Sequence, residues 1–243
     1  MSDLHPDETL TQGLVRRFAE RTIRTDLRRG LRRVVWVGEP APEALAPGRP
    51  LVLYANHHYY PDSYLLWHLT TQVLRRPMLV WMEAWDQAPL FGPVGALPFP
   101  EADPRERMRT IRVTARRMER DARTALYLYP EGTMGVPEDG LAPFRADLPR
   151  LARVLPEAVA WVPVGVRLVW WGESRPTALL GAGSPHEAPD GTERDRLGAV
   201  LDRLEAARPE AGQRVLLEGT AGADERWDLS RVAPFFRRLT FNE

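Results

Sequence analysis

Short apolar runs of strand length alternate along this chain with stretches of helical periodicity, and this alternation restricts the fold more than any other feature. The strand-like runs cover residues 51–55, 78–82, 96–99, 125–129, 158–169 and 178–181. The helix-like stretches cover residues 62–74, 104–121 and 191–207. Strands that alternate with helices are typical of a layered α/β domain. We therefore expect an α/β fold in which a mixed sheet is flanked by helices.

The first part of the chain has a different pattern. Residues 10–37 predict an amphipathic helix, because apolar residues recur at or near four-residue spacing and arginines occupy the other face. Residues 39–50 are rich in Pro, Ala and Gly and predict a connector. We therefore divide the chain into an N-terminal amphipathic helix with its connector, residues 1–50, and one α/β domain, residues 51–243.

Composition excludes several kinds of chemistry. The sequence has no cysteine, which excludes disulfides, a cysteine nucleophile and thiolate metal sites. All 33 residues counted as Lys or Arg are arginine, so a catalytic lysine and a phosphate-loop lysine are also excluded. The formal net charge at pH 7 is zero, and we expect no general attraction to nucleic acid.

The sequence also predicts where the protein works. No run reaches the ~18 apolar residues that a membrane-spanning helix needs. The first ten residues lack the basic and then apolar order of a secretory signal. We expect a protein that stays in the cytoplasm and does not span the membrane.

The sharpest local signal is Asn-His-His-Tyr-Tyr-Pro-Asp at residues 56–62, which follows a predicted strand and opens a predicted helix. Four residues separate His57 from Asp62, and a loop of that length can fold back so that the carboxylate meets one imidazole nitrogen. The other nitrogen is then free to take a proton from a hydroxyl, with the carboxylate fixing the tautomer. The activated hydroxyl would belong to a substrate.

Two other interpretations of this run stay open. Asp62 stands where a helix N-cap belongs, and His57 would then be an ordinary hydrogen-bonded histidine at a strand end. A metal site built from His57, His58, His68 and Asp62 is the other interpretation, but no second cluster of ligands supports it, and we expect no metal.

A second signal, Tyr-Pro-Glu-Gly-Thr at residues 129–133, directly follows another predicted strand. Ligands of α/β folds bind at strand ends. Glu131 and Thr133 would present a carboxylate and a hydroxyl there, and Gly132 would let a backbone N–H approach a ligand. Taken alone, the run also fits a simple strand-ending turn. Pro163, in Trp-Val-Pro-Val, is a weaker signal, because proline is awkward inside a central strand.

In this order, Asn-His-x4-Asp, Tyr-Pro-Glu-Gly-Thr and Val-Pro-Val resemble the motifs of the glycerolphosphate and lysophosphatidate acyltransferase family, over roughly residues 51–183. The resemblance implies that residues 51–243 form an acyltransferase domain in which His57 is the general base and Asp62 orients it. It further implies acceptor binding by Glu131, Gly132 and Thr133, a strand beside the site that contains Pro163, and an anion contact from Arg145 of the downstream Phe-Arg pair.

The reaction implied by the resemblance moves a fatty acyl group from acyl-CoA or acyl carrier protein to a lipid-type hydroxyl. The thioester is a cosubstrate, and no cofactor is expected. Residues 10–37 would lie on anionic lipid at the inner face of the cell membrane, with Trp81, Trp85, Trp170 and Trp171 as further anchors. The alternative is a helix that packs on its own domain and exposes its arginines to solvent.

Two departures from the family's pattern concern the acceptor. Glu101 and Met134 stand where the pattern suggests arginines that hold a phosphate. We therefore expect a neutral glycolipid or another neutral lipid alcohol as acceptor. The alternatives are a 1-acylglycerol-3-phosphate acyltransferase of phospholipid synthesis, a non-catalytic lipid-binding homologue, and a thioesterase that uses water.

Overall fold

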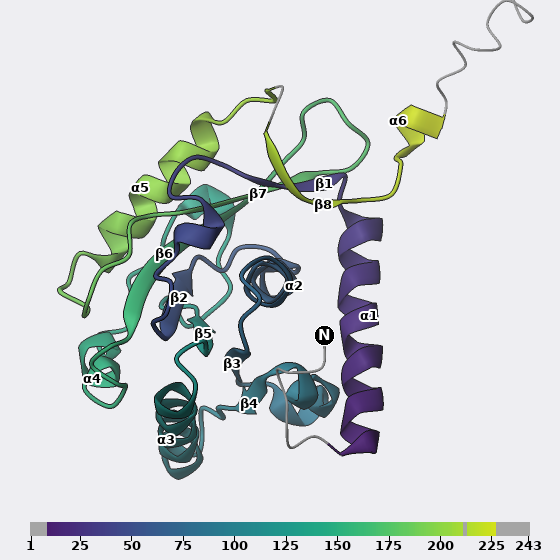
Figure 1. Ribbon diagram of the computed structural model, residues 1–243. Helices are drawn as coiled ribbons and strands as arrows, with labels where there is room; N and C mark the ends of the chain where they lie inside the picture. The colour runs from purple at the N-terminus through teal and green to yellow at the C-terminus, as the bar shows by residue number, and fades with distance from the viewer. Residues whose placement is uncertain (1–8, 211–212, 227–243) are drawn as a thin grey trace, which may run out of the picture.

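Eight strands form one mixed sheet in the order β4-β3-β5-β2-β6-β7-β1-β8 in the computed structural model, which describes residues 9–210 and 213–226 (Figure 1). Five neighbouring strands are parallel: β4 Ala96–Pro98, β3 Met78–Met82, β5 Ala125–Leu128, β2 Leu51–Ala55 and β6 Ala160–Val169. Three strands extend the sheet beyond β6: β7 Thr177–Ala182 antiparallel to it, β1 Arg33–Trp36 parallel to β7, and β8 Arg214–Glu218 antiparallel to β1. The expected mixed α/β sheet is confirmed.

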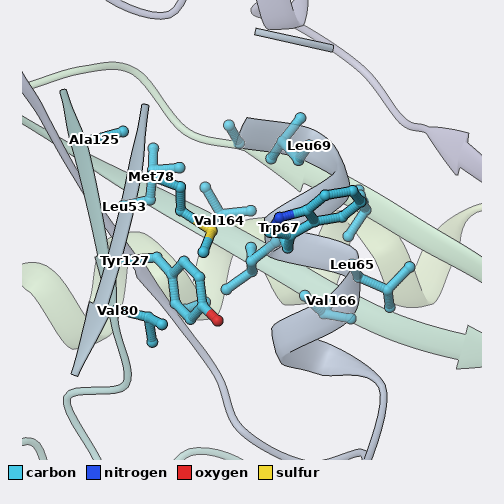
Figure 2. Packing of buried hydrophobic residues seen from close by; sticks show 14 of the residues in the cluster. Leu53, Leu65, Trp67, Leu69, Met78, Val80, Ala125, Tyr127, Val164 and Val166 are labelled. Carbon is cyan, nitrogen blue, oxygen red and sulfur yellow. The ribbon is translucent and has the colours of Figure 1, made fainter. Parts of the chain in front are cut away.

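Helices cover both faces of this sheet. One face packs against α1 Leu10–Gly30 and α2 Asp62–His68, and a π turn over Leu69–Val73 continues α2. The other face packs against α3 Pro104–Arg120, α4 Leu148–Ala152 and α5 Glu193–Ala206. Figure 2 shows the first core, where Trp67 of α2 lies over Leu53, Tyr127 and Val164 of the sheet. The remaining helical segments are short: η1 Pro42–Ala44, η3 Trp85–Gln87, η4 Pro89–Val94, η5 Pro137–Asp139 and α6 Ala223–Arg226. Within the described ranges, no helix has both the length and the apolar character needed to cross a bilayer.

The helix predicted over residues 10–37 is wrong in its last part. The helix ends at Gly30, and residues 33–36 form β1. Val34 and Val35 are fully buried, one in each of two different core clusters, because β1 lies inside the sheet and pairs with strands on both sides. β-branched side chains suit such a pleated, buried position. The division at residue 50 stays a prediction, although β1 precedes it and pairs with β7.

The edge strand β8 was not predicted. Its residues are exposed or half-buried, and only three apolar residues stand between Arg214 and Glu218, which is a shorter run than that of the buried strand β2. Trp227, Phe235 and Phe236, in the last part of the chain, lie outside the described residues.

The parallel register of β2 and β5 positions the site. The two strands are neighbours and end at the same edge of the sheet, with Tyr54 opposite Leu128. The loop that follows each strand therefore starts beside the other loop. Pro163 lies in β6, opposite Tyr54 of β2. On its other side, the hydrogen-bonded ladder with β7 begins only at Val164, and the isolated bridge of Trp161 with His186 precedes it. The N–H that proline lacks therefore falls in a gap between these two pairings.

Candidate active site

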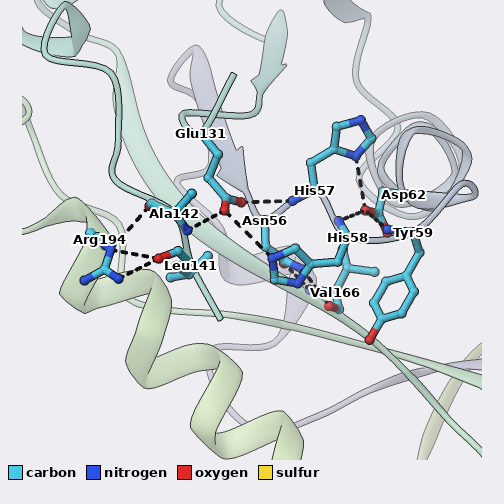
Figure 3. Close-up of polar contacts among 10 residues, drawn as sticks. All are labelled: Asn56, His57, His58, Tyr59, Asp62, Glu131, Leu141, Ala142, Val166 and Arg194. Atoms are coloured by element: carbon cyan, nitrogen blue, oxygen red, sulfur yellow. Dashed lines mark hydrogen bonds and ion pairs between the residues drawn. The ribbon is translucent and has the colours of Figure 1, made fainter. Parts of the chain in front are cut away.

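Asp62 is the buried anchor of the loop after β2. It is 0% exposed. Its Oδ2 accepts hydrogen bonds from the backbone N–H of His58 at 2.8 Å and of Tyr59 at 2.9 Å, and it lies 3.3 Å from Nδ1 of His57 (Figure 3). Pro61, not Asp62, is the N-cap of α2, so the N-cap interpretation of Asp62 is wrong. The carboxylate is instead the centre around which the loop folds.

His57 is held on one edge and on one face. While Asp62 holds Nδ1, the imidazole stacks on the ring of Tyr129 with centroids 4.0 Å apart and planes 11° apart. The Tyr129 hydroxyl lies 3.0 Å from Ser63 Oγ, and burial raises the pKa of Tyr129 well above its usual value, so this phenol stays neutral. An Nδ1–H that donates to Asp62 leaves Nε2 as the acceptor. The side chain of His57 remains 20% exposed, which leaves the ring accessible.

Glu131 joins the two loops. Its Oε1 accepts the backbone N–H of His57 at 3.2 Å, its Oε2 accepts that of Ala142 at 2.8 Å, and Nε2 of His58 lies 3.8 Å from Oε2. Burial raises the pKa of Glu131, but the contact with His58 and the two backbone hydrogen bonds outweigh it, so the pKa is lowered overall. Both oxygens are therefore engaged by the protein, and the geometry gives this carboxylate a positioning role. Its predicted acceptor-binding role stays a prediction.

Asn56 ties the same loop to the sheet. Its amide exchanges two hydrogen bonds of 2.9 Å with the backbone of Val166 on β6, and its Nδ2 lies 3.3 Å from Nδ1 of His58. The sequence showed Asn56 and Tyr129 in the motifs, but it assigned no contact to either. Their roles depend on strands that are distant along the chain.

Gly132, Thr133 and Arg145 complete the loop after β5. Gly132 has φ +79°, and its N–H bonds to Tyr129, which makes the tight turn that was expected. Arg145 N–H donates to Pro130 O at 2.9 Å, and the arginine side chain crosses Gly132 so closely that a Cβ there would lie 3.1 Å from Cδ. The structure thus brings the predicted acceptor-binding residues Glu131, Gly132, Thr133 and Arg145 beside the predicted catalytic pair, His57 and Asp62.

A cavity of about 770 Å³ opens beside this group, within the ~300–1,000 Å³ typical of ligand sites. His57, Tyr129, Gly132, Thr133 and Arg145 line it, and most of its remaining wall is apolar. The imidazole thus meets a space suited to a hydrocarbon ligand.

Residues 37–167, more than half of the chain, match the family model described as Acyltransferase. The chain belongs to this acyltransferase family. It is therefore an acyltransferase enzyme. A solved structure with the same fold is the crystal structure of the 1-acyl-sn-glycerophosphate (LPA) acyltransferase, PlsC, from Thermotoga maritima, with 16% identity, a TM-score of 0.52, and coverage of 82% of this chain and 81% of that chain. Comparison with curated protein sequences gave no significant match.

Charged side chains of both signs line the cavity of this acyltransferase. Glu101, noted above as a departure from the family's pattern, is joined there by Arg107 and Arg150. The guanidinium of Arg107 lies 4.5 Å from the ring centroid of Phe99. The sequence did not identify Arg150, whose place in the cavity depends on how α4 packs.

His68 lies apart from the other residues of the metal interpretation. Its Nε2 contacts the carbonyl oxygen of Leu216 on β8 at 3.1 Å, and burial lowers its pKa. In the described part of this acyltransferase, no three His, Cys, Asp or Glu side chains are grouped so that they could hold a metal ion.

Proposed function

We propose that this enzyme is an O-acyltransferase that moves a fatty acyl group from acyl-CoA or acyl carrier protein to a hydroxyl of a lipid, with His57 as general base. One observation carries the proposal: the His57 ring, held by a fully buried carboxylate, lines a large and mostly apolar cavity. A base at the wall of such a cavity suits a substrate with a hydroxyl beside a hydrocarbon part.

The steps follow from this geometry. Nε2 of His57 takes the hydroxyl proton as the oxygen attacks the thioester carbonyl carbon, and Asp62 stabilises the imidazolium that forms. The tetrahedral intermediate collapses, the C–S bond breaks, and the thiolate receives the proton from His57. The products are an ester and a thiol, and no residue of the enzyme is acylated in this mechanism.

Thiol release tests the proposal directly. Purified protein receives palmitoyl-CoA or palmitoyl carrier protein, with and without lipid alcohols, and both thiol and ester are measured. Acyl transfer predicts thiol release that depends on the alcohol and equals the ester formed. Alcohol-independent release would identify a thioesterase, and no release with either donor would identify a lipid-binding homologue.

The acceptor is the finer part of the proposal. Glu101 lines the cavity, and a carboxylate repels a phosphate monoester but accepts hydrogen bonds from sugar or polyol hydroxyls. We infer a neutral glycolipid or lipid alcohol. The second candidate is lysophosphatidate, favoured by Arg107, Arg145 and Arg150 in the same cavity and by the activity named for the Thermotoga maritima protein.

Paired acceptors should separate these candidates. With one acyl donor, we expect a higher kcat/KM for a monoacylglycerol or a glycosylated lipid alcohol than for lysophosphatidate of the same chain. Arg145→Ala should change the neutral reaction little. If lysophosphatidate is acylated efficiently and Arg145→Ala abolishes this activity, the acceptor is lysophosphatidate and the neutral-acceptor proposal is wrong.

Peripheral attachment to the inner face of the cell membrane is part of the same proposal. Leu10, Leu14 and Phe18 lie at four-residue spacing on α1 and are 92%, 67% and 64% exposed, whereas Ile23 and Leu27 of the same helix are buried in the core. Only the first half of α1 therefore offers an apolar stripe for a lipid surface. Among the tryptophans expected as anchors, Trp170 is 63% exposed, while Trp81 lines the cavity.

Replacing two residues of this stripe tests the attachment. Leu14→Ser with Phe18→Ser should weaken binding to vesicles that contain anionic lipid by at least about tenfold, because two large apolar side chains lose their burial. Flotation or sedimentation with vesicles measures this. Val136→Ser, at a 54% exposed apolar position in the loop before η5, is the control. Equal binding of the double variant and the control would rule out α1 as the anchor.

A further inference from the structure

The second histidine of the Asn-His-His run points away from the first. The ring of His57 lines the cavity of about 770 Å³, whereas His58 lines a separate hollow of about 430 Å³, whose wall comes mainly from α5 and the segment around η5. The two rings leave the loop after β2 in different directions (Figure 3). The side chain of His58 is 5% exposed. His58 therefore belongs to the interior behind this loop and does not face the cavity.

Two buried carboxylates hold the loop after β2, and His58 contacts both of them. Its backbone N–H donates to Asp62 Oδ2 at 2.8 Å, and its Nε2 lies 3.8 Å from Glu131 Oε2. Asp62 holds the imidazole of His57, and Glu131 accepts the backbone N–H of His57 at 3.2 Å. His58 thus joins the two groups that fix the position of His57.

Asn56 sets the tautomer of His58. Its Oδ1 accepts the N–H of Val166 and its Nδ2 donates to the carbonyl oxygen of Val166, each at 2.9 Å, so the backbone of β6 fixes the orientation of the amide. Nδ2 has a second hydrogen to donate, and it lies 3.3 Å from Nδ1 of His58. Nδ1 is then an acceptor, and a neutral imidazole carries its hydrogen on Nε2. This is the tautomer that presents an N–H to Glu131.

The contact between His58 and Glu131 lies out of water. The Glu131 side chain is 1% exposed, and among the residues that the structure describes, Nε2 of His58 has no hydrogen-bond partner. At 3.8 Å the contact is longer than a hydrogen bond and acts through electrostatics. Screening is weak at a buried site, so a carboxylate attracts a nearby N–H that has no other acceptor. The contact also contributes to the lowered pKa of Glu131.

We propose that His58 is a positioning residue of the acyl transfer: its Nε2–H holds Glu131 in place, and Glu131 in turn holds the backbone of His57 beside the cavity. The proposal rests on the acyltransferase function proposed above, and it assigns no proton transfer to His58. A misplacement of about 1 Å at a reacting group can cost about 10²-fold in rate. Because His58 does not line the cavity, its loss should lower kcat and leave the KM for donor and acceptor nearly unchanged.

Three substitutions of His58 give the test, with palmitoyl-CoA and a monoacylglycerol as substrates and with ester and thiol measured. His58→Leu removes both ring nitrogens and should lower kcat by at least about tenfold. His58→Gln can place a side-chain N–H near the position of Nε2, so its kcat should stay within about threefold of wild type. His58→Asn keeps a polar group beside Asn56 but is too short to reach Glu131, and it should resemble His58→Leu.

A double-mutant cycle shows whether His58 acts through Glu131. In a Glu131→Gln background, His58→Leu should lower kcat by no more than about twofold further, because the group that it positions has already been changed. His68→Leu is the matched control. It also removes a buried histidine, whose Nε2 contacts the carbonyl oxygen of Leu216 at 3.1 Å, and it should lower the melting temperature without lowering kcat.

Three results would overturn the proposal: a kcat for His58→Leu within about twofold of wild type, His58→Gln as slow as His58→Leu, or fully additive losses in the cycle. An equal loss of kcat in His68→Leu would also contradict it, because destabilisation alone would then explain the effect. A failure of the acyltransferase function would look different. Wild-type protein would form no ester, and the catalytic role of His58 would fall with that function, while thermal unfolding of the same variants would still show the coupling between His58 and Glu131.

Discussion

His57→Ala should lower kcat by about 10² to 10⁴-fold, which is the usual contribution of a general base. The variant removes the imidazole but keeps the backbone N–H that Glu131 accepts, so the loop should remain folded. Turnover is measured as ester formed per thiol released, and folding by circular dichroism and thermal unfolding. His186→Gln is the control, because His186 lies against Tyr54 and can be replaced by another group that bonds the phenol.

Asp62→Asn separates the charge of this residue from its shape. The amide oxygen can still accept the N–H groups of His58 and Tyr59, so the loop persists, but the imidazolium loses its carboxylate. We expect a large loss in kcat with a nearly unchanged melting temperature. Near-normal transfer by His57→Ala would show that another group removes the proton, whatever Asp62→Asn does.

Glu131→Gln should have the next largest effect, on both stability and kcat. Each oxygen of Glu131 accepts a backbone N–H, and an amide can accept only one of them; its NH₂ must face the other N–H. One buried donor is then left unsatisfied, at a cost of about 1–3 kcal/mol. Thermal or denaturant unfolding measures the loss. The kcat should fall as well, because the backbone of His57 is no longer held.

The pH dependence of unfolding distinguishes this role from simple packing. The pKa of Glu131 is lowered in the folded protein, so its contribution to stability is present above the unfolded pKa of about 4.3 and is lost as the pH falls through the folded value. The difference in stability between wild type and Glu131→Gln should therefore shrink below about pH 4. Glu138→Gln, on the exposed turn η5, is the control. A difference that stays constant with pH would contradict the proposed charge-assisted contacts.

The elements that sequence patterns predicted well are those whose environment is uniform along their length. β2 is buried at all five positions, and a strand covered on both faces needs an unbroken apolar run. α3 begins at Pro104 as predicted, because proline suits the first turn of a helix and Asp103 caps it. The residues of β1 were predicted to continue the preceding helix, because a run of four residues next to arginines is too short to distinguish the periodicity of a strand from that of a helix. Only pairing with β7 and β8 makes them a strand.

The site divides in the same way. The spacing of His57 and Asp62 is local, so the sequence by itself determined that the pair could meet, and the loop after β2 forms their contact. The tertiary structure alone decided what Glu131 does, because its partners are the backbone of His57, in the loop after β2, and of Ala142, 11 residues further along the loop after β5. It also decided that one cavity reaches both faces of the sheet. The sequence of a strand predicts which of its side chains share a face. The position at which β3 and β5 end beside each other depends on their register, and only the folded sheet establishes that register.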